Sequence, residues 1–342
     1  MIYPKVSILI SVYNQLHCLS TALKSALVQD YSNIEIVISD DYSTDGDVGG
    51  FVQSFGDERI KYFRNEQNLG MCKNFRRVLY DYATGEYAIM LNADDYWIDA
   101  SFISKAMKIF LENEEVALVF GDVRVYIAAR DTFLEDEMHK GLPSVMDGNW
   151  FFMEYPKGYS LPHLTCLYDR RLALQLDFYT NEVMSEDWES FLQLIQGKQI
   201  GYIPEKVGVF VRHLDNFTKS TSLEMLSQAD SYIHNIHQFA LNRGDFEEEA
   251  LDEWLFKMLK RHHIKWLVKL WFLDKKQLPF YKDFLRFNYP KLYRNIYLDI
   301  RYQGYLLIRR FPFLLKWVFR NVLKQESFIL DLLAYQSEKK RI

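Results

Sequence analysis

The sequence predicts an α/β fold, in which a mostly parallel sheet is flanked by helices and followed by a helical, basic region. Strand-like and helix-like segments alternate four times before residue 112. The strand-like segments are continuous apolar runs, as expected of parallel strands that are covered on both faces. Positive charge is concentrated from Phe256 onward, where 20 Lys and Arg face 6 Asp and Glu. These observations predict an α/β domain and an appendage with a different surface chemistry.

Each element follows from its own pattern of apolar residues. Short apolar runs predict strands, and longer stretches with helical periodicity predict the helices between them. The expected strands are 6–12, 34–38, 60–63, 87–91, 164–168, 200–205 and 207–213. The expected helices of the first part are 16–29, a stretch that ends at about Tyr82, and 101–112.

Polar residues follow each of the first four strands at its carboxyl end. They are Ser11 to Asn14, Ser39 to Gly46, Asn65 to Gly70, and Asn92 to Asp95. In an open α/β sheet the carboxyl ends of the strands line one crevice, where ligands bind. The sequence therefore predicts a ligand site at this edge of the sheet.

Asp94 and Asp95 are adjacent carboxylates at the end of a buried strand. Burial and mutual repulsion disfavour such a pair, and a divalent cation that bridges to phosphate would offset both effects. The pair is therefore interpreted as part of a metal and nucleotide site. Taken alone, it could also be a helix cap that the helix dipole favours.

The ordered motifs together resemble the inverting glycosyltransferases of family 2, which have the GT-A fold. The motifs are Pro4 to Asn14, Asp40-Asp41-x-Ser43-Thr44-Asp45-Gly46, Asn68-x-Gly70, Thr84-Gly85-Glu86-Tyr87 and Ala93-Asp94-Asp95. The resemblance covers about residues 4–215 and implies a nucleotide-sugar donor, Mn²⁺ or Mg²⁺, and a saccharide or lipid-linked saccharide acceptor. One departure is Asn92, where many members have Asp; Asn keeps an oxygen acceptor but lacks the charge.

The resemblance also implies roles for residues around the donor. It places Ser11, Tyr13 and Asp41 at the nucleotide base, Asp94 at the ribose and Asp95 on the metal ion. An Asp acceptor suits the ring N–H of uracil or thymine, so a pyrimidine is expected, although guanine also presents an N–H. Alternatively, Tyr13 is only a strand-end aromatic and Asp41 forms an Asx-turn. Asn68 is expected either to contact the donor or to shape its loop.

A second acidic pair, Glu186-Asp187, opens a helix-like run further along the chain. The resemblance implies that Asp187 is the general base for the acceptor hydroxyl. The dipole of the first helical turn favours an ionised carboxylate, which can accept that proton, although capping is the alternative role. His213 is implied to reach the metal or the diphosphate, but the spacer that the family often has between Arg and His is missing. Without the resemblance, His213 would be interpreted as a hydrogen-bonded structural residue.

The implied reaction is a single displacement with inversion at the anomeric carbon. One carboxylate activates the acceptor, while the cation stabilises the departing nucleoside diphosphate in place of a general acid. The family-level expectation for this reaction is synthesis of a surface polysaccharide or a lipid-linked oligosaccharide.

The basic region repeats cations at helical spacing. Arg261, Lys265 and Lys269 recur every four residues, with Ile264, Leu267 and Trp271 on other faces of the helix. Lys316, Arg320 and Lys324 repeat that spacing beside Leu314, Trp317, Val318 and Val322. Cations beside large apolar residues suit a helix that lies on an anionic membrane surface. The alternative is that these helices pack on the protein with a solvated basic face. Nucleic acid is not expected as a partner, because no nucleic-acid motif accompanies the charge.

Composition sets the expected organisation and compartment. A catalytic domain is expected over 1–220, with a nucleotide half (1–122) and an acceptor half (123–220), before a helical region over 221–342. No apolar stretch reaches the roughly 18 residues of a membrane span, and 6–12 is too short for a signal peptide. Three unpaired Cys fit a reducing cytoplasm, so the expected location is cytoplasmic, with peripheral contact at the inner face of the membrane.

The sequence disfavours three other functions. A dehydrogenase or a sugar nucleotidyltransferase needs a glycine-rich turn after the first strand, where this chain has Tyr13-Asn14-Gln15. An inert scaffold that binds nucleotide-sugar or membrane is disfavoured by the intact Asp94, Asp95 and Asp187, and a donor hydrolysis assay would identify it.

Overall fold

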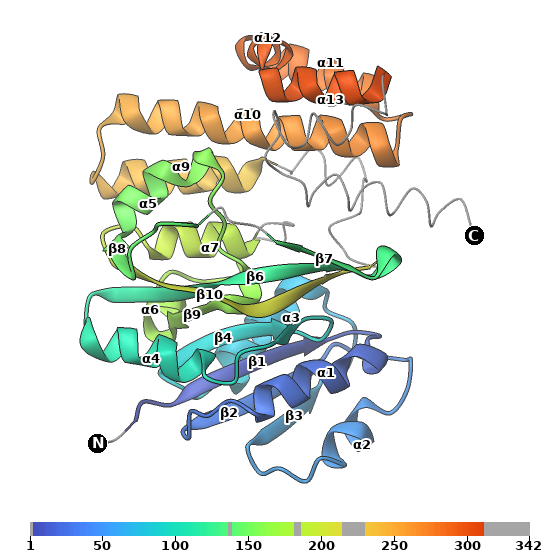
Figure 1. Cartoon of the computed structure of the whole chain (residues 1–342), viewed down its shortest axis with the longest axis vertical. Helices are drawn as coiled ribbons and strands as arrows, with labels where there is room; N and C mark the ends of the chain where they lie inside the picture. The colour runs from blue at the N-terminus through green and yellow to red at the C-terminus, as the bar shows by residue number, and fades with distance from the viewer. Residues whose placement is uncertain (1–2, 136–138, 181–185, 214–229, 311–342) are drawn as a thin grey trace. The chain divides into compact units, whose positions relative to one another are not determined.

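The computed structural model describes residues 3–135, 139–180, 186–213 and 230–310 (Figure 1). The chain divides into two compact units, which are described separately. The first contains Met1–Arg124 and Glu137–Val211, and the second contains Val125–Asp136 and Arg212–Ile342. The expected boundary at residue 220 stays a prediction.

The described strands form one mixed sheet in the order β3-β2-β1-β4-β9-β6-β10-β5, with β7 beside β6 and β8 beside β10. Its parallel part has β1 at the centre, paired with β2 on one side and β4 on the other. The strands of this part are β1 (Val6–Val12), β2 (Ile34–Asp40), β3 (Ile60–Arg64) and β4 (Tyr87–Asn92). This α/β arrangement confirms the fold class that the sequence predicts.

The parallel part is buried because helices cover its strands. All the apolar side chains of β1 are buried, and Leu19, Ala22, Leu23 and Ala26 of the neighbouring helix belong to the same core. The helices of the first unit are α1 (Leu16–Leu27), α2 (Val48–Gln53), α3 (Met71–Arg77), α4 (Phe102–Glu112), α5 (Gly148–Glu154), α6 (Arg170–Gln175) and α7 (Glu186–Leu194). A π-helical turn, Val78–Tyr82, extends α3 to the end that the sequence predicts.

The remaining strands contribute antiparallel pairings to the sheet. They are β5 (Tyr96–Trp97), β6 (Val116–Ile127), β7 (Thr132–Glu135), β8 (Val145–Asp147), β9 (Cys166–Asp169) and β10 (Gln199–Arg212). β9 lies between β4 and β6, while the two ends of β10 pair with β8 and β5. The sequence predicts two strands, 200–205 and 207–213, where the structure has the single strand β10. The chain stays extended through Pro204, which is exposed.

The second unit is helical. Its helices are α9 (Ser231–Arg243), α10 (Glu248–Leu273), α11 (Leu278–Asn288), α12 (Pro290–Leu298) and α13 (Ile300–Arg310). Twelve residues of α10 are buried, including Ile264, Leu267 and Lys269, and the Lys269 ammonium lies over the Trp266 ring at 4.1 Å. Ile264, Leu267 and Lys269 are therefore packed within the protein and do not form a free face for a membrane. The second expected stripe, Lys316 to Lys324, lies outside the described residues.

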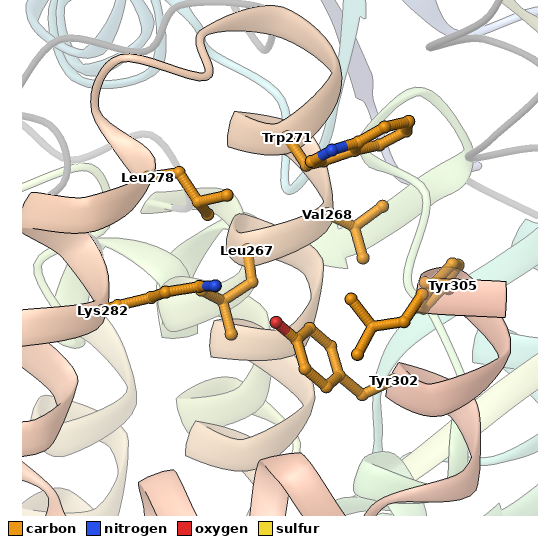
Figure 2. A pocket seen from close by; sticks show the side chains of 8 residues that line it. Leu267, Val268, Trp271, Leu278, Lys282, Tyr302 and Tyr305 are labelled. Carbon is orange, nitrogen blue, oxygen red and sulfur yellow. The ribbon is translucent and has the colours of Figure 1, made fainter. Parts of the chain in front are cut away.

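A small apolar pocket opens between α10, α11 and α13 of this unit (Figure 2). Leu267, Val268 and Trp271 line it from α10, Leu278 and Lys282 from α11, and Tyr302 from α13. Within the described ranges, none of the helices combines the length and the apolar composition that a bilayer span requires.

Candidate active site

The strand register brings together the predicted site residues that follow β1, β2 and β4. Ser11 on β1 is paired with Ser39 on β2 and with Asn92 on β4. The loops that follow these three strands therefore begin side by side. They carry Tyr13, Asp41 and the Asp94-Asp95 pair, as the sequence predicts for an open α/β sheet.

Asp95 is held at the end of β4 by backbone contacts. Its amide donates to the Asn92 carbonyl at 3.1 Å, and its Oδ1 accepts from the Val211 amide at 2.9 Å. The residue is only 1% exposed. Its Oδ2 is buried and has no hydrogen-bond partner among the described residues. A buried carboxylate oxygen without a partner is costly, so a ligand or a water molecule that donates to this atom, or a cation beside it, would be favourable.

The electrostatics of Asp95 fit a bound cation. Burial, followed by the neighbouring charge of Asp94, raises the pKa of Asp95 well above its usual value. A divalent ion at Oδ2 would satisfy the open acceptor and reverse both effects, because it favours the ionised form. The described residues contain no group of three or more His, Cys, Asp or Glu that could hold a metal. The Asp94-Asp95 pair can therefore contribute to an ion only together with other ligands, such as diphosphate oxygens.

The side chain of Asp41, in the loop that follows β2, accepts hydrogen bonds from the loop that follows β3. Its Oδ1 accepts from Asn65 Nδ2 and from the Leu69 amide, both at 2.8 Å. Its Oδ2 accepts from the Gly70 amide at 2.9 Å, and Asn68 Oδ1 accepts from the same amide at 3.0 Å. The structure thus gives Asp41 and Asn68 loop-bracing contacts, and their contacts with a donor stay predictions.

Asn74 on α3 connects the base-side residues, and the sequence analysis did not identify it. It is fully buried. Its Nδ2 donates to Ser11 Oγ at 2.7 Å and to the Ser39 carbonyl at 3.1 Å. Its Oδ1 accepts from Ser39 Oγ at 2.6 Å and from Asn65 Nδ2 at 3.0 Å. Since Asn65 also donates to Asp41, one hydrogen-bonded network joins Ser11 to Asp41.

Two tyrosines stand exposed at the ends of β1 and β2. Tyr13 is 48% exposed and Tyr42 is 45% exposed. Tyr42 has a φ of 67°, which is unusual for a bulky residue, and the Arg64 guanidinium lies 5.0 Å from the centre of its ring. Arg64 is itself fixed by Asp40 at 2.6 Å. Tyr42 is therefore a second aromatic at this edge, which the sequence analysis overlooked.

Asp187 lies in the first turn of α7 with a half-buried side chain. Burial raises its pKa to about 7, against backbone hydrogen bonds that lower it. Its charge in turn contributes to the raised pKa values of Cys166 and Tyr179. The Tyr179 hydroxyl lies 2.8 Å from Nε2 of His163, whose pKa burial lowers to about 3. The carboxylate therefore belongs to a cluster of uncharged polar groups, which suits a base that titrates near neutral pH.

The structure thus groups the predicted residues in three places. Ser11, Asp41 and Asn68 share a hydrogen-bonded framework, Asp94 and Asp95 form the acidic pair, and Asp187 acts electrostatically on Tyr179 and Cys166. His213 directly follows β10 and belongs to the second unit. Its proposed contact with the metal stays a prediction, although Val211, two residues earlier, binds Asp95.

The first half of the chain is similar to a known protein family. Residues 7–167 match the model of "Glycosyl transferase family 2". A 111-residue segment is 36% identical to the Escherichia coli "UDP-Glc:alpha-D-GlcNAc-diphosphoundecaprenol beta-1,3-glucosyltransferase WfaP". That match covers 32% of this chain and 43% of the relative, so the chain spans less than half of the relative's length.

Two solved structures share the fold over nearly the whole chain. Residues 1–349 of S. aureus TarS in complex with UDP-GlcNAc superpose with a TM-score of 0.67 at 18% identity, covering 98% of this chain and 91% of that one. The mannosyltransferase PcManGT from Pyrobaculum calidifontis in complex with GDP-Man and Mn²⁺ gives 0.57 at 16% identity, covering 99% and 89%. The fold is the GT-A fold of glycosyltransferases, with a helical carboxyl-terminal region.

Proposed function

From the match of residues 7–167 to glycosyl transferase family 2, we propose that this chain is a metal-dependent inverting glycosyltransferase of that family. It transfers a sugar from a nucleotide-sugar, UDP- or dTDP-linked, to a hydroxyl of a saccharide or lipid-linked saccharide during synthesis of a surface polysaccharide. The observation that carries the proposal is the buried Oδ2 of Asp95, which lacks a hydrogen-bond partner among the described residues and lies next to a second carboxylate at the carboxyl end of β4. This arrangement suits a cation that bridges protein and diphosphate.

In the proposed site, Asp95 would hold Mn²⁺ or Mg²⁺, Asp94 would bind the ribose and His213 would contact the metal or the diphosphate. The bound ion would supply positive charge to the leaving nucleoside diphosphate. Ser11, Tyr13, Asp41 and Asn68 bind the nucleotide. Tyr13 is exposed enough to stack on a base, and the Asn74 network fixes Ser11 relative to Asp41.

Asp187 is the proposed general base. Its carboxylate takes the proton of the acceptor hydroxyl while that oxygen bonds to the anomeric carbon and the bond to the diphosphate breaks. A pKa of about 7 makes it a stronger base than an ordinary Asp, and a substantial fraction is still ionised at neutral pH.

A lipid-linked acceptor is the proposed form of the second substrate. The E. coli relative named above acts, by its name, on a diphosphoundecaprenol-linked sugar. Such an acceptor is anchored in a membrane, so the proposed enzyme works at a membrane surface.

The function is tested by separating donor binding from transfer. Asp187→Asn keeps the shape of the side chain but cannot take the proton, so we expect transfer to fall at least roughly 1,000-fold with donor affinity within about twofold. Asp95→Ala should abolish the Mn²⁺-dependent part of donor affinity in isothermal titration. Asp81→Asn, at a side chain 59% exposed, is the matched control and should change neither quantity.

An unchanged Mn²⁺-dependent donor affinity in Asp95→Ala would contradict the metal assignment. The reaction products distinguish the alternative functions. Nucleoside diphosphate is the product expected of a glycosyltransferase, pyrophosphate consumption would indicate a nucleotidyltransferase, and no turnover with any nucleotide-sugar would indicate an inert scaffold.

A further inference from the structure

Helix α11 presents two large aromatic side chains to solvent. Phe280 is 69% exposed and Phe287 is 86% exposed. The two residues are seven apart, and because an α-helix has about 3.6 residues per turn, they lie on the same face. Exposed Phe is costly in water, and a pair aligned on one helix face indicates a surface that meets a partner.

Two other residues of α11 are buried and anchor the helix in its unit, so the exposure of the two Phe does not come from a loose helix. Tyr281 is 3% exposed and Leu285 is fully buried. The Tyr281 hydroxyl also contacts Nδ1 of the buried His263 on α10 at 2.6 Å. One apolar face of α11 therefore packs within the second unit, and a second apolar face is exposed to solvent.

The surroundings of these two Phe are basic. Residues 275–298 contain six Lys and Arg and one acid, Asp283, which pairs with Arg286 at 3.4 Å. Lys275, Lys276, Arg286, Lys291 and Arg294 are all exposed. Like charges would repel if a second copy of this chain docked through the same face, so self-association is disfavoured.

We propose that the α11 face, defined as Phe280 and Phe287 with the exposed cations of α11 and α12, binds the surface of an anionic phospholipid bilayer. Aromatic side chains enter the boundary between headgroups and acyl chains, while Lys and Arg pair with lipid phosphates. This face differs from the row of cations expected on α10, Arg261, Lys265 and Lys269. Lys269 is only 7% exposed, and its ammonium already lies over the Trp266 ring. The inference rests on the proposed function, because docking would bring the enzyme to a membrane-anchored acceptor.

The test is co-sedimentation of the whole chain with vesicles of phosphatidylglycerol and phosphatidylcholine. The double variant Phe280→Ser/Phe287→Ser should reduce partitioning onto anionic vesicles at least about tenfold, because two interfacial aromatic anchors are lost. Arg294→Gln should reduce it roughly fivefold on anionic vesicles, because one cation near the surface is lost. Pure phosphatidylcholine vesicles should bind the wild type weakly.

The matched control is Val28→Ser/Leu111→Ser, which removes two apolar side chains that are 62% and 55% exposed in the first unit. Vesicle binding of this control should equal that of the wild type. The proposal would be overturned if the Phe280→Ser/Phe287→Ser variant bound anionic vesicles as well as the wild type does. It would also be overturned if the wild type bound neither vesicle type. An acidic protein partner would then be the remaining candidate occupant of this face.

Failure of this inference is distinguishable from failure of the proposed function. Mn²⁺-dependent donor hydrolysis needs no membrane, so the Phe280→Ser/Phe287→Ser variant should keep wild-type hydrolysis. Loss of vesicle binding with intact hydrolysis supports the α11 face. Absence of hydrolysis in the wild type would instead contradict the proposed function, whatever the vesicles show.

Discussion

The chemistry of single residues depends on what surrounds them, and Asp187 illustrates this. Burial raises its pKa to about 7, so its ionised fraction changes most in the neutral range. If Asp187 is the base, the rate of transfer at saturating substrates should rise about tenfold per pH unit below 7 and level off above it. A pH–rate profile measured with Mn²⁺ held constant checks this. Asp187→Glu keeps a carboxylate and should keep a single ionisation; a flat profile from pH 5 to 8 in the wild type would exclude Asp187 as the base.

Asn74 shows how a residue without catalytic chemistry can matter to the same reaction. Asn74→Ala leaves Ser11, Ser39 and Asn65 without their shared partner, which should cost roughly 1–3 kcal/mol of stability. If the network positions the nucleotide site, UDP affinity should also fall about tenfold, as measured by titration calorimetry. Asn33→Ala removes an exposed bond to the Tyr3 carbonyl and serves as the control. Lost stability with unchanged UDP affinity would leave Asn74 a purely structural role.

The sequence indicates Asp94, Asp95 and Asp187 as candidate site residues but does not single out Asn74 and Tyr42, and the reason is physical. Carboxylates at strand and helix ends are recognisable by local position. An Asn on a helix looks like an ordinary surface residue, and only its long-range partners on β1 and β2 reveal that it is buried. Tyr42 lies inside a polar turn motif, so its exposed ring becomes evident only from the fold.

At the scale of elements, apolar runs locate strands well when both faces are covered. β1 has the bounds that the sequence predicts, because every apolar residue of 6–12 enters the core. β2 continues two residues beyond its apolar run, because Ser39 and Asp40 are buried with polar partners, Asn74 and Arg64. Such pairing depends on distant segments and leaves no local pattern.

The start of α5 offers a test of packing between elements. A Cβ on Gly148 would lie 2.0 Å from the Ile195 carbonyl oxygen and 2.7 Å from that of Lys198, both backbone atoms. Gly148→Ala should therefore lower the free energy of unfolding by roughly 3 kcal/mol in urea denaturation. A Cβ on Gly49 of α2 would meet side-chain atoms alone, the nearest being Tyr62 Cε1 at 3.1 Å, so Gly49→Ala should cost less. Equal stability of the two variants would mean that α5 shifts without strain.

At the scale of the whole molecule, buried histidines in both units tie stability to pH. Burial lowers the pKa values of His163 in the first unit and of His262 and His263 in the second. Below the ordinary His pKa of about 6.5, these side chains bind protons in the unfolded chain but stay neutral in the folded protein. The free energy of unfolding should therefore fall as the pH drops from 6.5. Asp187 acts oppositely, because its raised pKa lets the folded state hold a proton that the unfolded chain releases between about pH 4 and 7.

The histidine contribution can be isolated with one variant. His163 has a pKa of about 3, so between that value and 6.5 it should contribute one proton of uptake on unfolding, or about 1.4 kcal/mol per pH unit. His163→Gln should remove this slope from the free energy of unfolding measured by urea titration between pH 5 and 6, whatever its effect at pH 8. The exposed His17→Gln is the control and should leave the slope unchanged. An unaltered slope in His163→Gln would mean that His163 is already protonated in the folded protein, and that the cluster beside Asp187 carries a positive charge.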